Sequence, residues 1–245
     1  MSGFFYDLGR KAAPAVVRAR WIYRSLTGTE SERIKAEYAM GCYLTYLHTR
    51  DGNLDRTPQT VRRLNETAGR LARCLTNRDR RFQVRCLTTP EPNAFALPGG
   101  FLFVSRSLLE LCEYDDEEIA FVLAHEMGHV VRGHSFNRLM TSEVVKVLSR
   151  GGALRGAFKG PLKPMVARLV NQLVTQGYSR RQEFEADHFA ARLTQASGYD
   201  PQASTRLFER LKAETTEPQN LDAYFSSHPP FNDRIRRLRE NFPSD

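Results

Sequence analysis

The sequence contains few cysteines, and none of them stands in a Cys-x-x-Cys pair. The four are Cys42, Cys74, Cys86 and Cys112 in a chain of 245 residues. A metal site built from closely spaced thiolates is therefore not expected. One or two disulfides would fit the number alone, but buried free thiols in a reducing compartment are the simpler interpretation.

Long apolar runs are also absent. No segment reaches the roughly 18 consecutive apolar residues that a membrane-spanning helix needs. The first residues do not form the apolar core of a signal peptide, because Asp7, Arg10 and Lys11 stand where that core would run. We therefore expect a soluble and cytoplasmic chain.

Residues 1–26 mix aromatic side chains with arginines, and Trp21 stands between Arg20 and Arg24. Such a segment can rest on a membrane surface. It can equally form an N-terminal helix that docks on the rest of the chain. Peripheral membrane contact through residues 1–26 is therefore one of two open interpretations.

The charge is unbalanced, with 36 lysines and arginines, 28 acidic residues and a net charge of +8. A basic surface can attract nucleic acid or acidic lipid. Here the arginines are scattered along the chain, and no RNP, zinc-finger or helix-turn-helix motif accompanies them. We therefore expect a basic, well-solvated surface and no nucleic-acid partner.

Hydrophobic periodicity predicts an α+β chain that is mostly helical. Two helices are expected near the N-terminus, over 29–50 and 57–75. Thr57 should cap the second helix, and Pro58 should be its first residue. These helices suggest a division into an N-terminal helical segment, 1–78, and a second domain, 79–245.

The pattern changes after the second helix. Residues 81–88, 94–97 and 101–104 read as short strands, with a Pro-Gly-Gly turn between the last two. The remainder is nearly all helical, apart from a glycine-rich loop at 151–160 that could act as a mobile lid. The later helices are expected over 115–134, 136–149, about 164–176, 180–197, 201–215 and 229–241.

The helix expected at 115–134 contains the segment "LAHEMGHVVRGH". Asp115 and Glu118 have the spacing of a capping box at its start. Its apolar run, 119–131, has Glu126 as its one charged residue, and a helix that is apolar on all sides is buried. Burying a carboxylate and imidazoles is costly unless something pairs with them, and a metal ion can do so.

His125 and His129 are four residues apart, so they project from one face of the helix. This spacing suits two zinc ligands, while Glu126 points elsewhere and can contact a zinc-bound water without binding the metal. The arrangement is the HExxH motif of two ligands and a general base. A core helix with satisfied histidines is the alternative.

His134 does not fit the third-ligand position of the metzincin pattern, because that pattern requires Gly and His where Arg132 and Ser135 stand. A structural role for His134 is expected instead. The best source of a third ligand is the predicted helix at 180–197. There Glu183 can bind zinc, and Asp187, four residues later on the same face, can accept a hydrogen bond from a ligating histidine. A solvated acidic helix face is the alternative.

Taken together, "HEMGH" at 125–129 and "EFEAD" at 183–187 resemble peptidase family M48, a gluzincin family of zinc metallopeptidases. The resemblance implies a zincin-type fold with a small β-sheet beside the active-site helix, one Zn²⁺ per chain and Glu183 as the third ligand. Ste24 and HtpX members have membrane helices. This chain, in which no such segment is found, is therefore more similar to the soluble, Oma1-like or minimal gluzincin members.

Two further segments extend the resemblance over residues 80–242. "NAFALPGGFLFVS", 93–105, is similar to the segment that lies along the cleft in gluzincins and pairs with the substrate backbone. Asn93 and Ala94, with Phe101 and Phe103 in the adjoining strand, are the implied substrate-binding residues.

"SSHPPFNDRIRRL", 226–238, is similar to the family's C-terminal segment. There His228 would face the zinc, and Arg234 would hold the site's architecture or contact the oxyanion. If His228 were brought onto the zinc, it would displace the catalytic water and leave the enzyme latent. The alternative is a histidine that only orients substrate.

The sequence therefore predicts a zinc metalloendopeptidase that hydrolyses extended or unfolded polypeptides. Glu126, His228 and Arg234 are the expected catalytic residues, and Glu126 would activate the zinc-bound water. A binding or chaperone module without significant turnover is the main alternative. A basic surface protein with a structural metal is a third, but structural zinc sites are usually closed.

Overall fold

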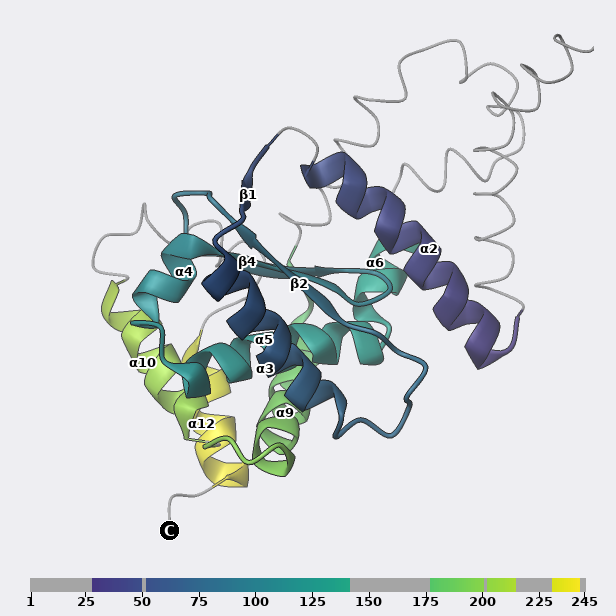
Figure 1. The fold of residues 1–245 in the computed structure, drawn as a ribbon. Coiled ribbons are helices and arrows are strands. Elements are labelled where there is room, and N and C mark those ends of the chain that lie inside the picture. Colours follow the sequence, from purple (N-terminus) through teal and green to yellow (C-terminus); the bar gives the residue numbers. More distant parts are fainter. Residues whose placement is uncertain (1–27, 50–51, 142–176, 201, 215–230, 243–245) are drawn as a thin grey trace, which may run out of the picture.

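The structure, a computed structural model, describes residues 28–49, 52–141, 177–200, 202–214 and 231–242 (Figure 1). Several sequence predictions lie outside these residues. They are the possible membrane contact through 1–26, the glycine-rich loop at 151–160, the helix at about 164–176 and the position of His228.

A four-stranded mixed sheet forms the centre of the fold. Its strands are β1 (Leu54–Asp55), β2 (Gln83–Leu87), β3 (Ala94–Leu97) and β4 (Phe101–Ser105), in the order β1-β2-β4-β3. β2 and β4 are parallel, and the outer strands β1 and β3 pair antiparallel to them. The three predicted strands are confirmed. β1 was missed because two residues carry no periodic signal.

The sheet is buried on both faces, and alternate residues divide between two hydrophobic clusters. One face packs against α3 (Pro58–Ala72) and α5 (Asp116–Val131), through Val84, Cys86, Ala94, Ala96, Leu102 and Val104. The other packs against α2 (Glu30–Thr49) and α6 (His134–Thr141), through Leu87, Phe95, Leu97, Phe101 and Phe103.

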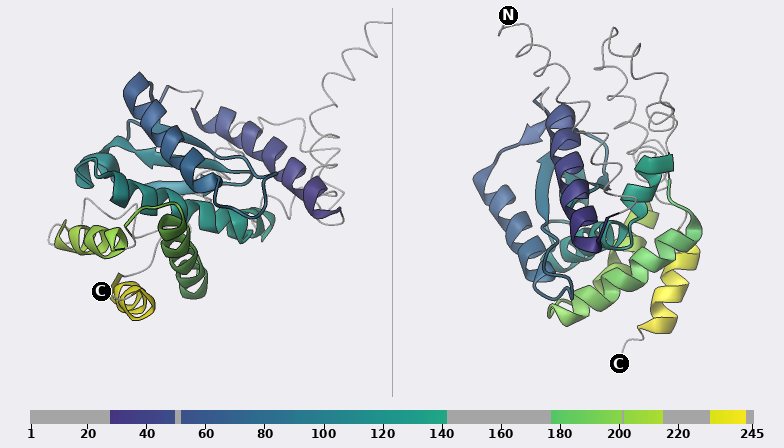
Figure 2. Two further views of the ribbon diagram at one scale, coloured as in Figure 1. Left: turned by 60° about the horizontal axis from the view of Figure 1, so that its bottom comes forward. Right: turned by 90° about the vertical axis from the view of Figure 1, so that its right-hand side faces the viewer.

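The later helices form a further layer. They are α9 (Arg180–Ala196), α10 (Ala203–Glu214) and α12 (Phe231–Asn241), and they lie on the side of α5 away from the sheet (Figure 2). A short helix, α4 (Arg106–Leu111), connects β4 to the loop before α5. The predicted α+β, mostly helical architecture is confirmed. No described helix combines the length and the apolar character needed to cross a bilayer.

α3 shares its core with the rest of the fold. Its buried residues Leu64, Ala68 and Leu71 belong to the same cluster as Val84 of β2 and Leu123 of α5. The division at residue 78 stays a prediction, but the helix that precedes it contributes to the core that follows it.

All four cysteines are free thiols. Cys86 and Cys112 are buried, whereas Cys42 and Cys74 are exposed. The interpretation as free thiols is therefore confirmed, but burial holds for only two of them.

Local signals explain where the helices begin. Ser179 and Gln182 form a complete capping box at the start of α9. The side chain of Asp115 accepts hydrogen bonds from two backbone N–H groups at the start of α5. The prediction for Thr57 was wrong in its detail. Thr57 occupies the N-cap position of α3, but its hydroxyl donates to Asp55 instead of capping the helix.

The predicted helix at 115–134 ends earlier than expected, and the next helix, predicted from residue 136, begins earlier. α5 ends at Val131, and α6 begins at His134. Between them Gly133 has φ +74°, the left-handed conformation in which glycine commonly terminates a helix. The chain therefore turns at Gly133, and His134 does not continue the helical path of His129.

α5 and α9 approach closely at Gly128. A Cβ atom at this position would lie 3.1 Å from Cδ1 of Phe189 and 3.2 Å from Cα of Ala186, both on α9. Real side chains rarely tolerate such short contacts. The absence of a side chain at Gly128 therefore sets how near the two helices can lie.

We expect Gly128→Val to lower the free energy of unfolding by about 1–3 kcal/mol, because overpacking forces side chains and backbone to shift. Chemical denaturation followed by circular dichroism measures this change. Gly69→Val is the matched control in α3, where the nearest atom to an added Cβ is 4.0 Å away. It should alter the free energy of unfolding by less than about 0.5 kcal/mol. Equal losses in the two variants would contradict a special role for the α5–α9 contact.

Candidate metal centre

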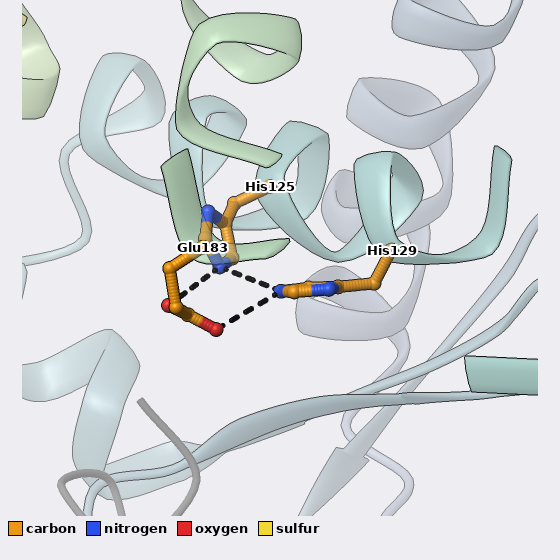
Figure 3. A group of neighbouring side chains, drawn as sticks. All are labelled: His125, His129 and Glu183. Atoms are coloured by element: carbon orange, nitrogen blue, oxygen red, sulfur yellow. Dashed lines mark hydrogen bonds and ion pairs between the residues drawn. The ribbon is translucent and has the colours of Figure 1, made fainter. Parts of the chain in front are cut away.

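The structure brings His125 and His129 of α5 together with Glu183 of α9 (Figure 3). The two Nε2 atoms are 3.1 Å apart. The Glu183 carboxylate lies 3.6 Å from Nε2 of His125 and 3.4 Å from Nε2 of His129. All three side chains are buried. The residues predicted from two distant motifs therefore converge on one point inside the protein.

These separations suit a tetrahedral metal ion. At a zinc site with bonds of about 2.0–2.1 Å, neighbouring ligand atoms are about 3.3–3.4 Å apart. The three observed distances lie within a few tenths of an ångström of this value. Two imidazole nitrogens and a carboxylate are also a ligand set typical of zinc.

Asp187 supports the ring of His125. Its Oδ1 lies 2.9 Å from Nδ1 of His125, the nitrogen that faces away from the cluster. Asp187 also accepts two hydrogen bonds from Arg234, at 2.7 and 2.6 Å. Burial raises the pKa of Asp187, but the positive charge of Arg234 and the hydrogen bonds from Arg234 and His125 outweigh this effect, so the pKa is lowered. Asp187 is therefore held as a carboxylate beside His125.

Arg234 connects α12 to the carboxylate of Glu183 as well as to Asp187. Its Nη1 lies 3.0 Å from Oε2 of Glu183, and its side chain is 2% exposed. The guanidinium also lies over the ring of Phe208, with Cζ 4.6 Å from the ring centroid. Arg234 thus contacts both carboxylates of α9 that face the cluster, and its contacts fix it in place.

A second set of contacts supports the ring of His129. Nδ1 of His129 lies 3.0 Å from Nδ1 of His134, and Nε2 of His134 lies 3.3 Å from Oε2 of Glu185. Glu185 also accepts a hydrogen bond from Arg181 at 2.8 Å. From the sequence, only a structural role was expected for His134 and no function for Glu185. The signal that could have found them is Gly133, which turns the chain back toward His129.

The charge states of this second set follow from its surroundings. Burial lowers the pKa of His134, although the hydrogen bond to Glu185 opposes the shift. The hydrogen bond from Arg181 lowers the pKa of Glu185. A neutral imidazole therefore lies against a carboxylate.

Tyr178 covers the face of the His129 ring. The two rings are stacked, with centroids 3.6 Å apart and planes 11° from parallel. Cζ of Arg138 lies 3.8 Å from the centroid of Tyr178, and the tyrosine hydroxyl is 3.3 Å from Oγ of Ser135. Burial raises the pKa of Tyr178, so the phenol is neutral. Tyr178 was not predicted from the sequence, because it precedes the capping box of α9 and belongs to no motif.

Glu126, the predicted general base, is 1% exposed in α5 next to His125. Burial is the largest cause of the raised pKa of Tyr178. Arg138 lowers this pKa, and the negative charge of Glu126 raises it further. Glu126 therefore lies within electrostatic reach of the ring that covers His129.

The predicted substrate-binding residues are placed differently from one another. Asn93 directly precedes β3, and its backbone N–H and C=O bond to the side chain and backbone of Ser105. Ala94 begins β3 and is 1% exposed. Phe101 and Phe103 lie in the inner strand β4 and are buried against α2, on the sheet face opposite α5. Their placement in the core does not support substrate contact by these two rings.

Comparison with known proteins shows related sequences. A model described as peptidase family M48 matches residues 58–241. The mitochondrial metalloendopeptidase OMA1 of Schizosaccharomyces pombe is 33% identical over 165 residues, which are 67% of this chain and 48% of that protein. The metalloprotease LoiP of Escherichia coli is 29% identical, over 62% of this chain and 60% of LoiP. The protease HtpX of Chromohalobacter salexigens is 32% identical, over 74% of this chain and 72% of HtpX.

The chain thus spans about half the length of the OMA1 relative and three fifths of LoiP. The matched region contains the HExxH segment of α5, the EFEAD segment of α9 and Arg234 of α12. Because the family model covers well over half of the sequence, the chain belongs to peptidase family M48.

Proposed function

We propose that this protein is a zinc-dependent metalloendopeptidase that hydrolyses extended or unfolded polypeptides. The observation that carries the proposal is the convergence of His125, His129 and Glu183 at distances suited to one metal ion. The names of the relatives, among them a metalloendopeptidase and a metalloprotease, support peptide hydrolysis as the reaction.

The protonation of the two histidines favours a cation between them. A hydrogen bond from Nδ1 of His125 to Asp187 requires the proton to be on Nδ1, which leaves a lone pair on Nε2. The same applies to His129 if its Nδ1 donates to His134. Two lone pairs and the Glu183 carboxylate would then face one another in a buried volume, which is costly without a positive charge.

Zinc is the metal that best fits this ligand set. Imidazole nitrogen and carboxylate oxygen suit zinc, and three protein ligands are typical of catalytic rather than structural zinc sites. When bound, the ion would polarise the scissile carbonyl and lower the pKa of a water molecule.

Glu126 would act as the general base and then as the general acid. It follows His125 directly, so its side chain leaves α5 about 100° around the helix from that ligand. We propose that Glu126 takes a proton from the attacking water and delivers it to the leaving amine.

Arg234 would position the site rather than contact the oxyanion. Both roles were open from the sequence alone. The two hydrogen bonds to Asp187 and the ion pair with Glu183 support the first, because they occupy the guanidinium with groups of α9. The role predicted for His228 in latency stays a prediction.

The substrate would bind along β3. This strand is the last in the described sheet and pairs with β4 on one side. An extended peptide can add to such an edge through backbone hydrogen bonds, which requires a flexible chain and sets few demands on sequence. Asn93 and Ala94, at the start of β3, are the proposed contacts.

We expect Glu126→Gln to lower the rate of hydrolysis of an unfolded protein such as reduced casein by about 10²–10⁴-fold, the usual contribution of a general acid–base group. Zinc content, measured by atomic emission on the purified variant, should equal that of the parent. Glu110→Gln, at an exposed site on α4, is the control and should retain activity. Undiminished, chelator-sensitive turnover by Glu126→Gln would sink the mechanism. A parent that binds zinc and unfolded chains without cleaving them would favour a binding module.

We expect Asp187→Asn to reduce zinc affinity by about 10–100-fold, the typical effect of losing a partner of a ligating histidine. The free energy of unfolding of the metal-free protein should fall by about 1.5–3 kcal/mol, since Arg234 loses its hydrogen bonds to a carboxylate but keeps its ion pair with Glu183. Chelator competition and urea denaturation measure the two quantities. Asp233→Asn, an exposed site on α12, is the control. Parent-like zinc affinity in Asp187→Asn would remove the proposed support of His125.

A further inference from the structure

We propose that His134 is a positioning residue for the metal site: it holds the ring of His129 from behind and links it to Glu185. The inference rests on the proposed metal-binding function. His129 would then be supported by an imidazole, whereas His125 is supported by the carboxylate of Asp187.

The hydrogen bonds define one consistent arrangement of protons. If Nε2 of His129 faces a metal, Nδ1 carries the proton and donates to Nδ1 of His134, 3.0 Å away. His134 must then carry its own proton on Nε2, where it can donate to Glu185 at 3.3 Å. The Glu185 carboxylate thus fixes the proton of His134 on Nε2, and this leaves Nδ1 of His134 free to accept the hydrogen bond from His129.

The turn at Gly133 makes this contact possible. In a continuous helix, residues five apart are about 140° apart around the axis, so His134 would point away from His129. α5 ends at Val131, and Gly133 adopts φ +74°. The chain therefore turns back, and the side chain of His134 lies against His129 of α5. The two ring centroids are 5.2 Å apart.

Packing restricts His129 to this partner. Tyr178 stacks on its ring at a centroid distance of 3.6 Å, and the side chain of His129 has no exposed surface. With the ring plane fixed and Nε2 directed at the cluster, Nδ1 faces His134. The stacking and the hydrogen bond to His134 together fix the orientation of the His129 ring.

The two supports differ in burial. Asp187 and Arg234, behind His125, are both almost completely buried. Behind His129, Glu185 is 37% exposed and Arg181 is 89% exposed, so this set of contacts leads from the metal site to the surface. We therefore expect the support of His129 to be the weaker of the two.

The test is the zinc affinity of the metal-free 245-residue chain, measured by competition with a chromophoric chelator. His134→Phe keeps a ring of similar size but removes both hydrogen bonds. Affinity should fall by about 10-fold, the lower end of the range for losing a partner of a ligating histidine. His134→Asn retains an acceptor close to the position of Nδ1, so it should recover part of the loss. A histidine that only filled the core would show no such recovery.

Glu185→Gln should cause a smaller loss than His134→Phe, because Glu185 acts through His134. In the His134→Phe background the same substitution should have no further effect on zinc affinity. The matched control is His188→Phe, an exposed histidine on α9. It should bind zinc as the parent does.

Zinc affinity equal to the parent's in His134→Phe would overturn the inference and leave the proposed metal site intact. If His134→Phe does not fold, Glu185→Gln and His134→Asn decide the question, and parent-like affinity in both would overturn it. A parent protein that does not bind zinc would overturn the inference together with the proposed function.

Discussion

The cost of burying polar groups is the constraint on which the rest of this structure depends. Two imidazoles and a carboxylate lie at the contact between α5 and α9, where at most 3% of each residue is exposed to solvent. Each must therefore be matched by a partner inside the protein or by a bound ion. Within the protein, Asp187 is the partner of His125, His134 the partner of His129 and Arg234 the partner of Glu183.

The helix pair provides the geometry that this constraint requires. The close approach at Gly128 brings α9 near enough for Glu183 to reach the histidines. α9 then supplies two further carboxylates that play different parts. Asp187, one turn after Glu183, supports His125, while Glu185 points to the other side of α9 and meets His134.

The sequence was sufficient for the parts of the site that depend on helical spacing. The intervals between His125 and His129, and between Glu183 and Asp187, place each pair on one helix face whatever the tertiary structure is. It was insufficient where the chain leaves the helix. His134 was predicted as the last residue of the helix at 115–134. That helix ends at Val131 instead, and the left-handed conformation of Gly133 brings His134 back to His129. Likewise, the burial of Phe101 and Phe103 on the α2 face follows from the sheet register, which a strand pattern alone does not fix.

The supports of the site also tie it to the whole fold. The first histidine depends on Arg234 of α12, which reaches it through Asp187 of α9. The second depends on the turn before α6 and on Tyr178, ahead of the capping box of α9. Ligands held by such distant segments cannot be pre-assembled in an unfolded chain. A metal bound here would thus bind the folded state preferentially, and its binding free energy would add to the stability of α5, α9 and α12 as a unit.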